Sequence, residues 1–171
     1  AGGTIAGGHT IRNPEPIFGL AVQGVVHPQR VFRKGGAVAG DVLMLSKPIG
    51  TALALAGGSA SDKAAAIAGM RRLNRLASEQ LQALGAAVHA VTDVTGYGLA
   101  GHGWEVAERG NVKVIVDTDG IVAYPGAREA AERGTAVQRQ DRVLAERAVA
   151  HGGDVEDLRG VRLRAVRPAD V

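Results

Sequence analysis

The residues best suited to chemistry lie in residues 91–102, which read VTDVTGYGLAGH. Small apolar residues precede this segment and a helix-compatible stretch follows at residues 99–109, so the pattern predicts a strand, a glycine turn and a helix start. Backbone N–H groups at a helix N-terminus are unpaired and lie at the positive end of the helix dipole. Glycines there allow the main chain to approach an anion closely. The segment therefore predicts a phosphate-binding turn.

Asp93 lies at the end of the expected strand, beside the hydroxyl groups of Thr92 and Thr95. One carboxylate with neighbouring hydroxyl oxygens suits magnesium, because Mg²⁺ uses few protein carboxylates and completes its shell with phosphate and water oxygens. The alternative is structural: a strand, a glycine turn and a helix occur in most α/β proteins, and an aspartate before a helix is often its cap. The pattern alone leaves a ligand site and a helix cap both open.

The composition restricts the class of protein. The 171 residues include no cysteine, which excludes disulfides, thiolate metal sites and a cysteine nucleophile within them and is typical of a cytoplasmic protein. No apolar run approaches the roughly 20 residues that a membrane span requires. The net charge of +3 equals that of residues 159–171, which hold four arginines and one aspartate, and only 3% of the chain is aromatic. No nucleic-acid partner and no membrane partner is therefore expected.

Three motifs, in the same order along the chain, resemble those of the selenophosphate synthetases, also called selenide, water dikinases. The first is AGGHTI at residues 6–11, followed by PEPIFGLAV at residues 14–22; the second is KPIGT at residues 47–51; the third is TDVTGYGLAGH at residues 92–102. They cover most of residues 6–134, and three ordered motifs are far more specific than a glycine pattern. On this resemblance the chain is identified as the C-terminal part of a member of that family.

The resemblance also assigns residues of the site. It implies that Gly8, His9 and Thr10 contact ATP at a dimer interface, and that Asp93 is one of several carboxylates that bind Mg²⁺. Thr10 keeps the hydroxyl of the family's serine, whereas Arg12 stands where the family often has an aspartate. Without the resemblance, His9 is read as an exposed loop histidine. No catalytic residue is expected within the chain, because the family's cysteine or selenocysteine and its lysine would precede the first residue.

The resemblance implies an ATP-dependent enzyme that converts selenide, ATP and water to selenophosphate, AMP and phosphate, for the synthesis of selenocysteine and selenouridine. ATP and selenide are the implied substrates, Mg²⁺ the cofactor, and a cytoplasmic homodimer the expected form. Because the family's nucleophile and most of its Mg²⁺ ligands would lie outside these residues, the isolated chain is predicted to be inactive. Two alternatives stay open: a non-catalytic domain fragment, and another ATP-dependent enzyme of the superfamily such as thiamine monophosphate kinase.

The spacing of apolar residues predicts alternating strands and helices, and hence an α+β fold of the α/β sandwich type. The resemblance specifies the C-terminal domain of the aminoimidazole ribonucleotide synthetase-like fold, preceded by the last strand region of the N-terminal domain. Expected strands are residues 17–26, 42–45, 86–91 and 112–116, and expected helices are residues 63–84, 99–109, 127–133 and 142–150. Ser61 and Asp62 are expected to cap the helix that begins at residue 63, and Gly85 to end it.

Three units follow from these elements. Residues 1–35 are expected to be the end of the N-terminal ATP-binding domain, residues 36–158 an incomplete C-terminal domain, and residues 159–171 a divergent basic tail. The family's DPQTSGG motif is missing where the tail begins. If Arg167 to Val171 were encoded CGA CCC GCA GAC GTC, a shift of one base would read Asp-Pro-Gln-Thr-Ser. A frameshifted tail is expected to pack poorly, because such residues were never selected to match a fold; the alternative is a divergent C-terminus.

Overall fold

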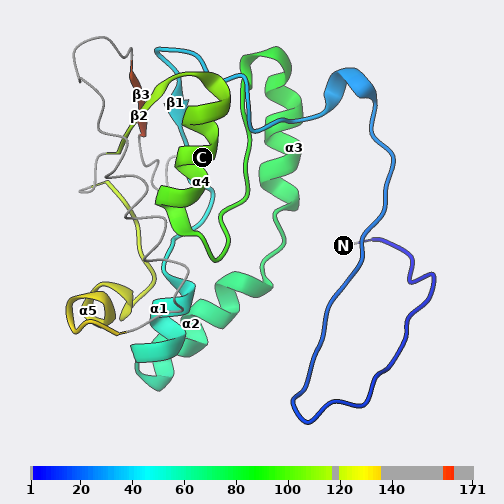
Figure 1. Cartoon of the computed structure of the whole chain (residues 1–171), viewed down its shortest axis with the longest axis vertical. Coiled ribbons are helices and arrows are strands. Elements are labelled where there is room, and N and C mark those ends of the chain that lie inside the picture. The colour runs from blue at the N-terminus through cyan, green and yellow to red at the C-terminus, as the bar shows by residue number, and fades with distance from the viewer. Residues whose placement is uncertain (1, 117–119, 136–159, 164–171) are drawn as a thin grey trace. The chain divides into compact units, whose positions relative to one another are not determined.

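The computed structural model describes residues 2–116 and 120–135, together with the backbone of residues 160–163 (Figure 1). It divides into two compact units, Ala1–Val31 and Phe32–Val171, which are described separately. In chain order the elements are η1 (Pro28–Arg30), β1 (Val42–Leu43), α1 (Thr51–Gly57), α2 (Ala60–Arg71), α3 (Arg75–Leu84), η2 (Gly85–Ala87), α4 (Gly98–Gly110), β2 (Lys113–Val116), α5 (Ala127–Glu132) and β3 (Gly160–Leu163). The helix expected at residues 142–150 lies outside the described residues, and the expected boundaries at residues 35 and 158 stay predictions.

The first unit is a largely extended chain. Its 3-10 helix η1 begins after His27, whose Nδ1 accepts a hydrogen bond from the Gln29 N–H at 3.3 Å. The described residues of this unit are exposed, including Ile5 at 93% and Phe18 at 90%. The strand expected at residues 17–26 does not form, because a strand needs a neighbour for its backbone hydrogen bonds and the described part of this unit offers none.

Three short strands of the second unit form a parallel sheet in the order β1-β3-β2. Leu163 of the central strand is paired with Leu43 on one side and with Val116 on the other. β1 and β2 confirm the strands expected at residues 42–45 and 112–116, although β1 is shorter than expected. The second unit is thus a mixture of helices and sheet, as the sequence indicates, while the layers of a sandwich stay a prediction.

The central strand β3 belongs to the basic tail, for which the sequence shows no strand period. Its backbone nevertheless pairs with both neighbours over residues 160–163. A central strand is held by main-chain hydrogen bonds, which do not depend on side-chain type, so this pairing left no signal in the residue pattern. The remainder of the tail lies outside the described residues, and the frameshift and the divergent terminus both stay predictions.

Helices α1, α2 and α5 pack around small side chains. Ala54 and Ala66 are fully buried, Ala127 is nearly so, and the Tyr124 ring packs in the same cluster. A Cβ on Gly69 of α2 would lie 1.9 Å from Tyr124 Oη, so the ring rests directly on the helix backbone. The sequence pattern did not predict α1, whose seven residues are too few to show a helical period, whereas α5 confirms the helix expected at residues 127–133.

The single helix expected at residues 63–84 is two helices, α2 and α3. α2 begins earlier than expected, at a capping box in which Ser59 Oγ accepts from the Asp62 N–H at 3.3 Å and Asp62 Oδ2 accepts from the Ser59 N–H at 2.9 Å. It ends at Arg71, and the next residue, Arg72, has an extended backbone (φ −67°, ψ 124°) and a carbonyl that accepts a hydrogen bond from the Lys47 ammonium. The helix ends here even though the apolar period continues, and the Lys47 ammonium binds a carbonyl that the helix end leaves unpaired.

The segment between α3 and α4 differs from its expected form. Gly85 ends α3 as predicted, with a left-handed φ of 55°, but η2 then occupies the start of the strand expected at residues 86–91. Further along, the Val91 N–H donates to the Arg33 carbonyl at 2.8 Å. One such hydrogen bond aligns two segments but does not form the ladder of a β-sheet. The small apolar residues at 86–91 were therefore not sufficient to predict a strand.

Helix α4 confirms the helix expected at residues 99–109 and packs on β2. Val106 is buried, and a Cβ on Gly110 would lie 2.9 Å from the Ala37 carbonyl oxygen, so the end of the helix touches the loop before β1. Asn111 ends the helix in the left-handed conformation, with φ 49° and ψ 48°. In the ranges that the structure describes, no helix is long and apolar enough to cross a bilayer.

Candidate functional site

The predicted anion turn lies between the Val91 segment and α4. The Gly98 N–H donates to the Thr95 carbonyl at 2.9 Å, which closes a tight turn, and Gly98 adopts a φ of 67° that favours glycine. The N-cap of α4 is Tyr97, and it makes no side-chain capping hydrogen bond. Asp93 therefore does not cap α4, whereas its role as a ligand stays a prediction.

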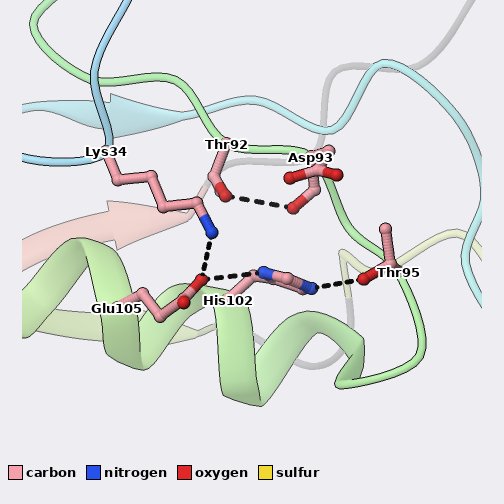
Figure 2. A network of polar contacts seen from close by, with 6 residues as sticks. All are labelled: Lys34, Thr92, Asp93, Thr95, His102 and Glu105. Carbon is pink, nitrogen blue, oxygen red and sulfur yellow. Dashed lines mark hydrogen bonds and ion pairs between the residues drawn. The ribbon is translucent and has the colours of Figure 1, made fainter. Parts of the chain in front are cut away.

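The Asp93 carboxylate is exposed. Its neighbour Thr92 donates its hydroxyl to the Asp93 backbone carbonyl at 3.1 Å, a contact that leaves the carboxylate unused (Figure 2). Within the described part of the chain, no hydrogen-bond donor and no cationic side chain meets the two carboxylate oxygens. An unshared carboxylate at the entry to a glycine turn is available to a ligand from outside this unit.

A chain of polar contacts lies behind the turn, as Figure 2 shows. Thr95 Oγ1 lies 3.0 Å from His102 Nε2, and His102 Nδ1 lies 2.9 Å from Glu105 Oε2. The same Glu105 oxygen accepts a hydrogen bond from Lys34 Nζ at 2.5 Å. His102 is 4% exposed, whereas the side chains of Lys34 and Glu105 are about one-third exposed. The contacts therefore connect a surface ion pair to the turn through one buried imidazole.

The protonation of Glu105 determines the direction of these hydrogen bonds. The hydrogen bond from Lys34, and after it the one from His102, holds the pKa of Glu105 below its usual value. An ionised carboxylate only accepts, so His102 Nδ1 carries a proton and donates a hydrogen bond to Glu105.

Two glycines bring Lys34 to this site. A Cβ on Gly35 would lie 3.1 Å from Arg109 Cβ, and one on Gly36, whose φ is 124°, would lie 2.6 Å from the His89 carbonyl oxygen. The loop that carries Lys34 thus runs against the end of α4 on one side and the segment before Asp93 on the other. In the sequence this glycine pair indicates only a boundary between units. In the structure the close contacts of the two glycines position Lys34.

The sequence reasoning gave no role to Lys34, His102 or Glu105. His102 lies inside the third motif, and its spacing of three residues from Glu105 is typical of two side chains on one helix face. That spacing is a weak signal which occurs by chance on many helices. Nothing in the sequence relates Lys34 to Glu105, because the two are 71 residues apart.

Gly8, His9 and Thr10 lie in the first unit, on an extended and exposed segment. A Cβ on Gly8 would meet no atom within 4 Å, so the segment is open within its own unit. The structure brings Thr92, Asp93 and Thr95 together in one turn of the second unit. The assignment of these three residues to ATP stays a prediction.

The described side chains fit magnesium only as part of a larger ligand set. Within residues 2–116 and 120–135, no three histidine, aspartate or glutamate side chains come together to hold a metal ion. Asp93 offers one free carboxylate, which matches the few protein oxygens that Mg²⁺ uses beside phosphate and water. Arg33, Lys34 and Arg109 surround an open depression of about 700 Å³, so a positive surface adjoins the Lys34 end of the contacts.

Comparison with known proteins identifies the family. The family described as AIR synthase related protein, C-terminal domain, matches residues 38–147. The selenide, water dikinase of Caldanaerobacter subterraneus subsp. tengcongensis is 43% identical over 139 residues, 78% of this chain and 40% of that protein. The enzyme of the same name from Myxococcus xanthus is 46% identical over 126 residues, 71% of this chain and 36% of that protein. No solved structure matches the chain.

The predicted resemblance is thereby confirmed. The chain spans about 40% of the length of the Caldanaerobacter protein, so the comparison concerns one part of a longer enzyme. The match at residues 38–147 contains α4, the Asp93 turn and the contacts between His102 and Glu105. The chain therefore belongs to the AIR synthase related proteins through their C-terminal domain, and the curated relatives that it matches are selenide, water dikinases.

Proposed function

We propose that this chain supplies the C-terminal domain of an enzyme that makes selenophosphate from selenide, ATP and water, with AMP and phosphate as the other products. One observation carries the proposal beyond the likeness to selenide, water dikinases: Asp93 ends in a free carboxylate that neither caps α4 nor joins an ion pair in the described residues. A carboxylate that the fold itself does not use is available to a metal site shared with other ligands.

Asp93 is one of several Mg²⁺ ligands in this proposal, and the others come from outside the described residues. When bound, Mg²⁺ neutralises the charge of the polyphosphate and orients it. Gly8, His9 and Thr10 contact ATP, and the enzyme works as a homodimer in the cytoplasm. The chain has no cysteine that could supply a thiolate nucleophile, so these residues do not catalyse the reaction by themselves.

A chimaeric enzyme tests the proposal. Residues 38–147 replace the matching segment of the Caldanaerobacter enzyme, and phosphorus NMR detects selenophosphate formed from ATP and selenide. We expect the chimaera to be active and Asp93→Asn to lower its Mg²⁺-dependent turnover by at least about tenfold, equivalent to about 1.4 kcal/mol of transition-state stabilisation. Glu108→Gln, which removes an exposed charge elsewhere on α4, is the matched control and should change turnover little.

Three results would contradict the proposal. Full activity of Asp93→Asn throughout a Mg²⁺ titration would remove Asp93 from the metal site. A folded chimaera that phosphorylates thiamine monophosphate instead of selenide would favour the alternative enzyme. Selenophosphate formed by the unfused 171 residues would show that the chain is active alone.

A further inference from the structure

His102 stands out among the polar side chains of the second unit. It is the one buried polar residue in the described part of the chain, with 4% of its surface exposed. Burying an imidazole is costly unless its nitrogens are hydrogen-bonded, and both nitrogens of His102 are: Nδ1 to Glu105 and Nε2 to Thr95. The two hydrogen bonds indicate that His102 does more than fill space in the core.

The turn in front of His102 has few restraints of its own. Gly96 and Gly98 flank Tyr97, and glycines lose more backbone entropy on ordering than other residues. α4 starts without a side-chain cap, and the main-chain bonds that close the turn run from Gly98 to Thr95 and from Gly101 to Tyr97. Such a turn needs an attachment from elsewhere to keep one conformation.

His102 provides that attachment at two points. Its Nε2 lies 3.0 Å from Thr95 Oγ1, and its ring lies 5.9 Å from the Tyr97 ring, centroid to centroid, at an angle of 57°. On the other side, Glu105 fixes the imidazole through Nδ1, and Lys34 holds Glu105 from a separate loop.

We propose that His102 is a positioning residue for the metal-binding turn: by holding Thr95 and Tyr97 against α4 it fixes the backbone that carries Asp93, without touching the ion itself. This inference rests on the proposed function in that Asp93 is the ligand. The gain is preorganisation, because a carboxylate already held in place does not lose conformational freedom when the ion binds.

Substitutions that keep or remove one hydrogen-bonding group of His102 or Thr95 distinguish a positioning role of His102 from a packing role. Glutamine at position 102 places an amide near the position of Nε2, and asparagine places one near that of Nδ1. His102→Gln should therefore keep the contact with Thr95, and His102→Asn should lose it. Likewise Thr95→Ser keeps the hydroxyl, whereas Thr95→Val removes it at constant shape.

Amide hydrogen exchange of the metal-free 171-residue chain is the first measurement. In Thr95→Val and His102→Asn, exchange at Gly98 and Gly101, whose N–H groups close the turn, should become about 3–10 times faster, the effect expected when one hydrogen bond is lost from a local opening reaction. Thr95→Ser and His102→Gln should stay near the parent rate, and Val106 in the middle of α4 should be unchanged in all four. Equal acceleration along the whole helix, or none at the turn, would overturn the proposal.

Paramagnetic broadening by Mn²⁺ alone is the second measurement. The turn amides of the parent chain should broaden, those of Asp93→Asn should not, and Thr95→Val should need about 3–10 times more Mn²⁺ for the same broadening. If Asp93→Asn broadens like the parent, the proposed metal role fails while the exchange result still decides whether His102 holds the turn. If Thr95→Val and the parent respond to Mn²⁺ identically, the turn is held but the ligand is not positioned, and the inference is wrong.

Discussion

The starts of helices α2 and α4 use their aspartates in opposite ways. At α2, Asp62 accepts hydrogen bonds from the Ser59 hydroxyl at 2.7 Å and the Ser59 N–H at 2.9 Å, and these bonds hold its pKa below the usual value. At α4, Asp93 takes no part in capping, and the helix start is held through His102 instead. At α2 the carboxylate of Asp62 stabilises the helix start. At α4 residues elsewhere in the fold hold the helix start, so the carboxylate of Asp93 stays free for binding.

The two helices also differ in how tightly they pack, which a pair of matched substitutions tests. Gly69→Ala puts a methyl group into the Tyr124 ring and should lower the free energy of unfolding by about 1–3 kcal/mol. Gly103→Ala in α4 meets only Val114 Cγ1, at 4.0 Å, and should raise it by up to about 1 kcal/mol through helix propensity. Denaturant unfolding followed by circular dichroism measures both, and a stabilising Gly69→Ala would show that Tyr124 does not rest on α2.

Substitutions at the N-termini of α2 and α4 should affect the stability of the fold differently. Ser59→Ala removes the capping hydroxyl and should lower the free energy of unfolding by about 1 kcal/mol. Ser61→Ala, whose hydroxyl meets only that of Ser59, is the control and should cost less. Asp93→Asn should shift the midpoint of thermal unfolding by no more than about 2 °C, because Asp93 makes no capping bond. A fall as large as that of Ser59→Ala would mean that both aspartates serve the fold.

The smallest expected effect concerns pH. The folded-state pKa of Glu105 is lowered from its usual 4.5, so ionised Glu105 stabilises the fold fully above that value and loses this effect as pH falls through the lower folded-state pKa. Glu105→Gln should therefore destabilise the chain at pH 7 and differ less from the parent near pH 3. Glu79→Gln removes the same charge from the exposed pair with Arg75 and is the control. A difference between Glu105→Gln and the parent that stays constant from pH 3 to pH 7 would contradict the ion-pair geometry.

Local sequence signals correctly predicted the elements whose caps and apolar spacing lie within their own residues. Helices α4 and α5 and strands β1 and β2 lie where the apolar spacing and the turn residues indicate, because caps and periodicity act within a few residues. The single helix expected over residues 63–84 was wrong, because the backbone becomes extended at Arg72, between α2 and α3. The same reasoning failed at residues 86–91 and at β3, because pairing of strands depends on which neighbour is present.

The sequence by itself determined the family and the position of the turn, because those rest on residue types in a short ordered motif, and it predicts Asp93 as a ligand. Only the tertiary structure decided that Asp93 is no cap and that His102 joins Thr95 to Glu105 and Lys34. The reason is physical: a hydrogen bond between Lys34 and Glu105 spans 71 residues, and it exists only because two glycines allow a loop to lie against α4.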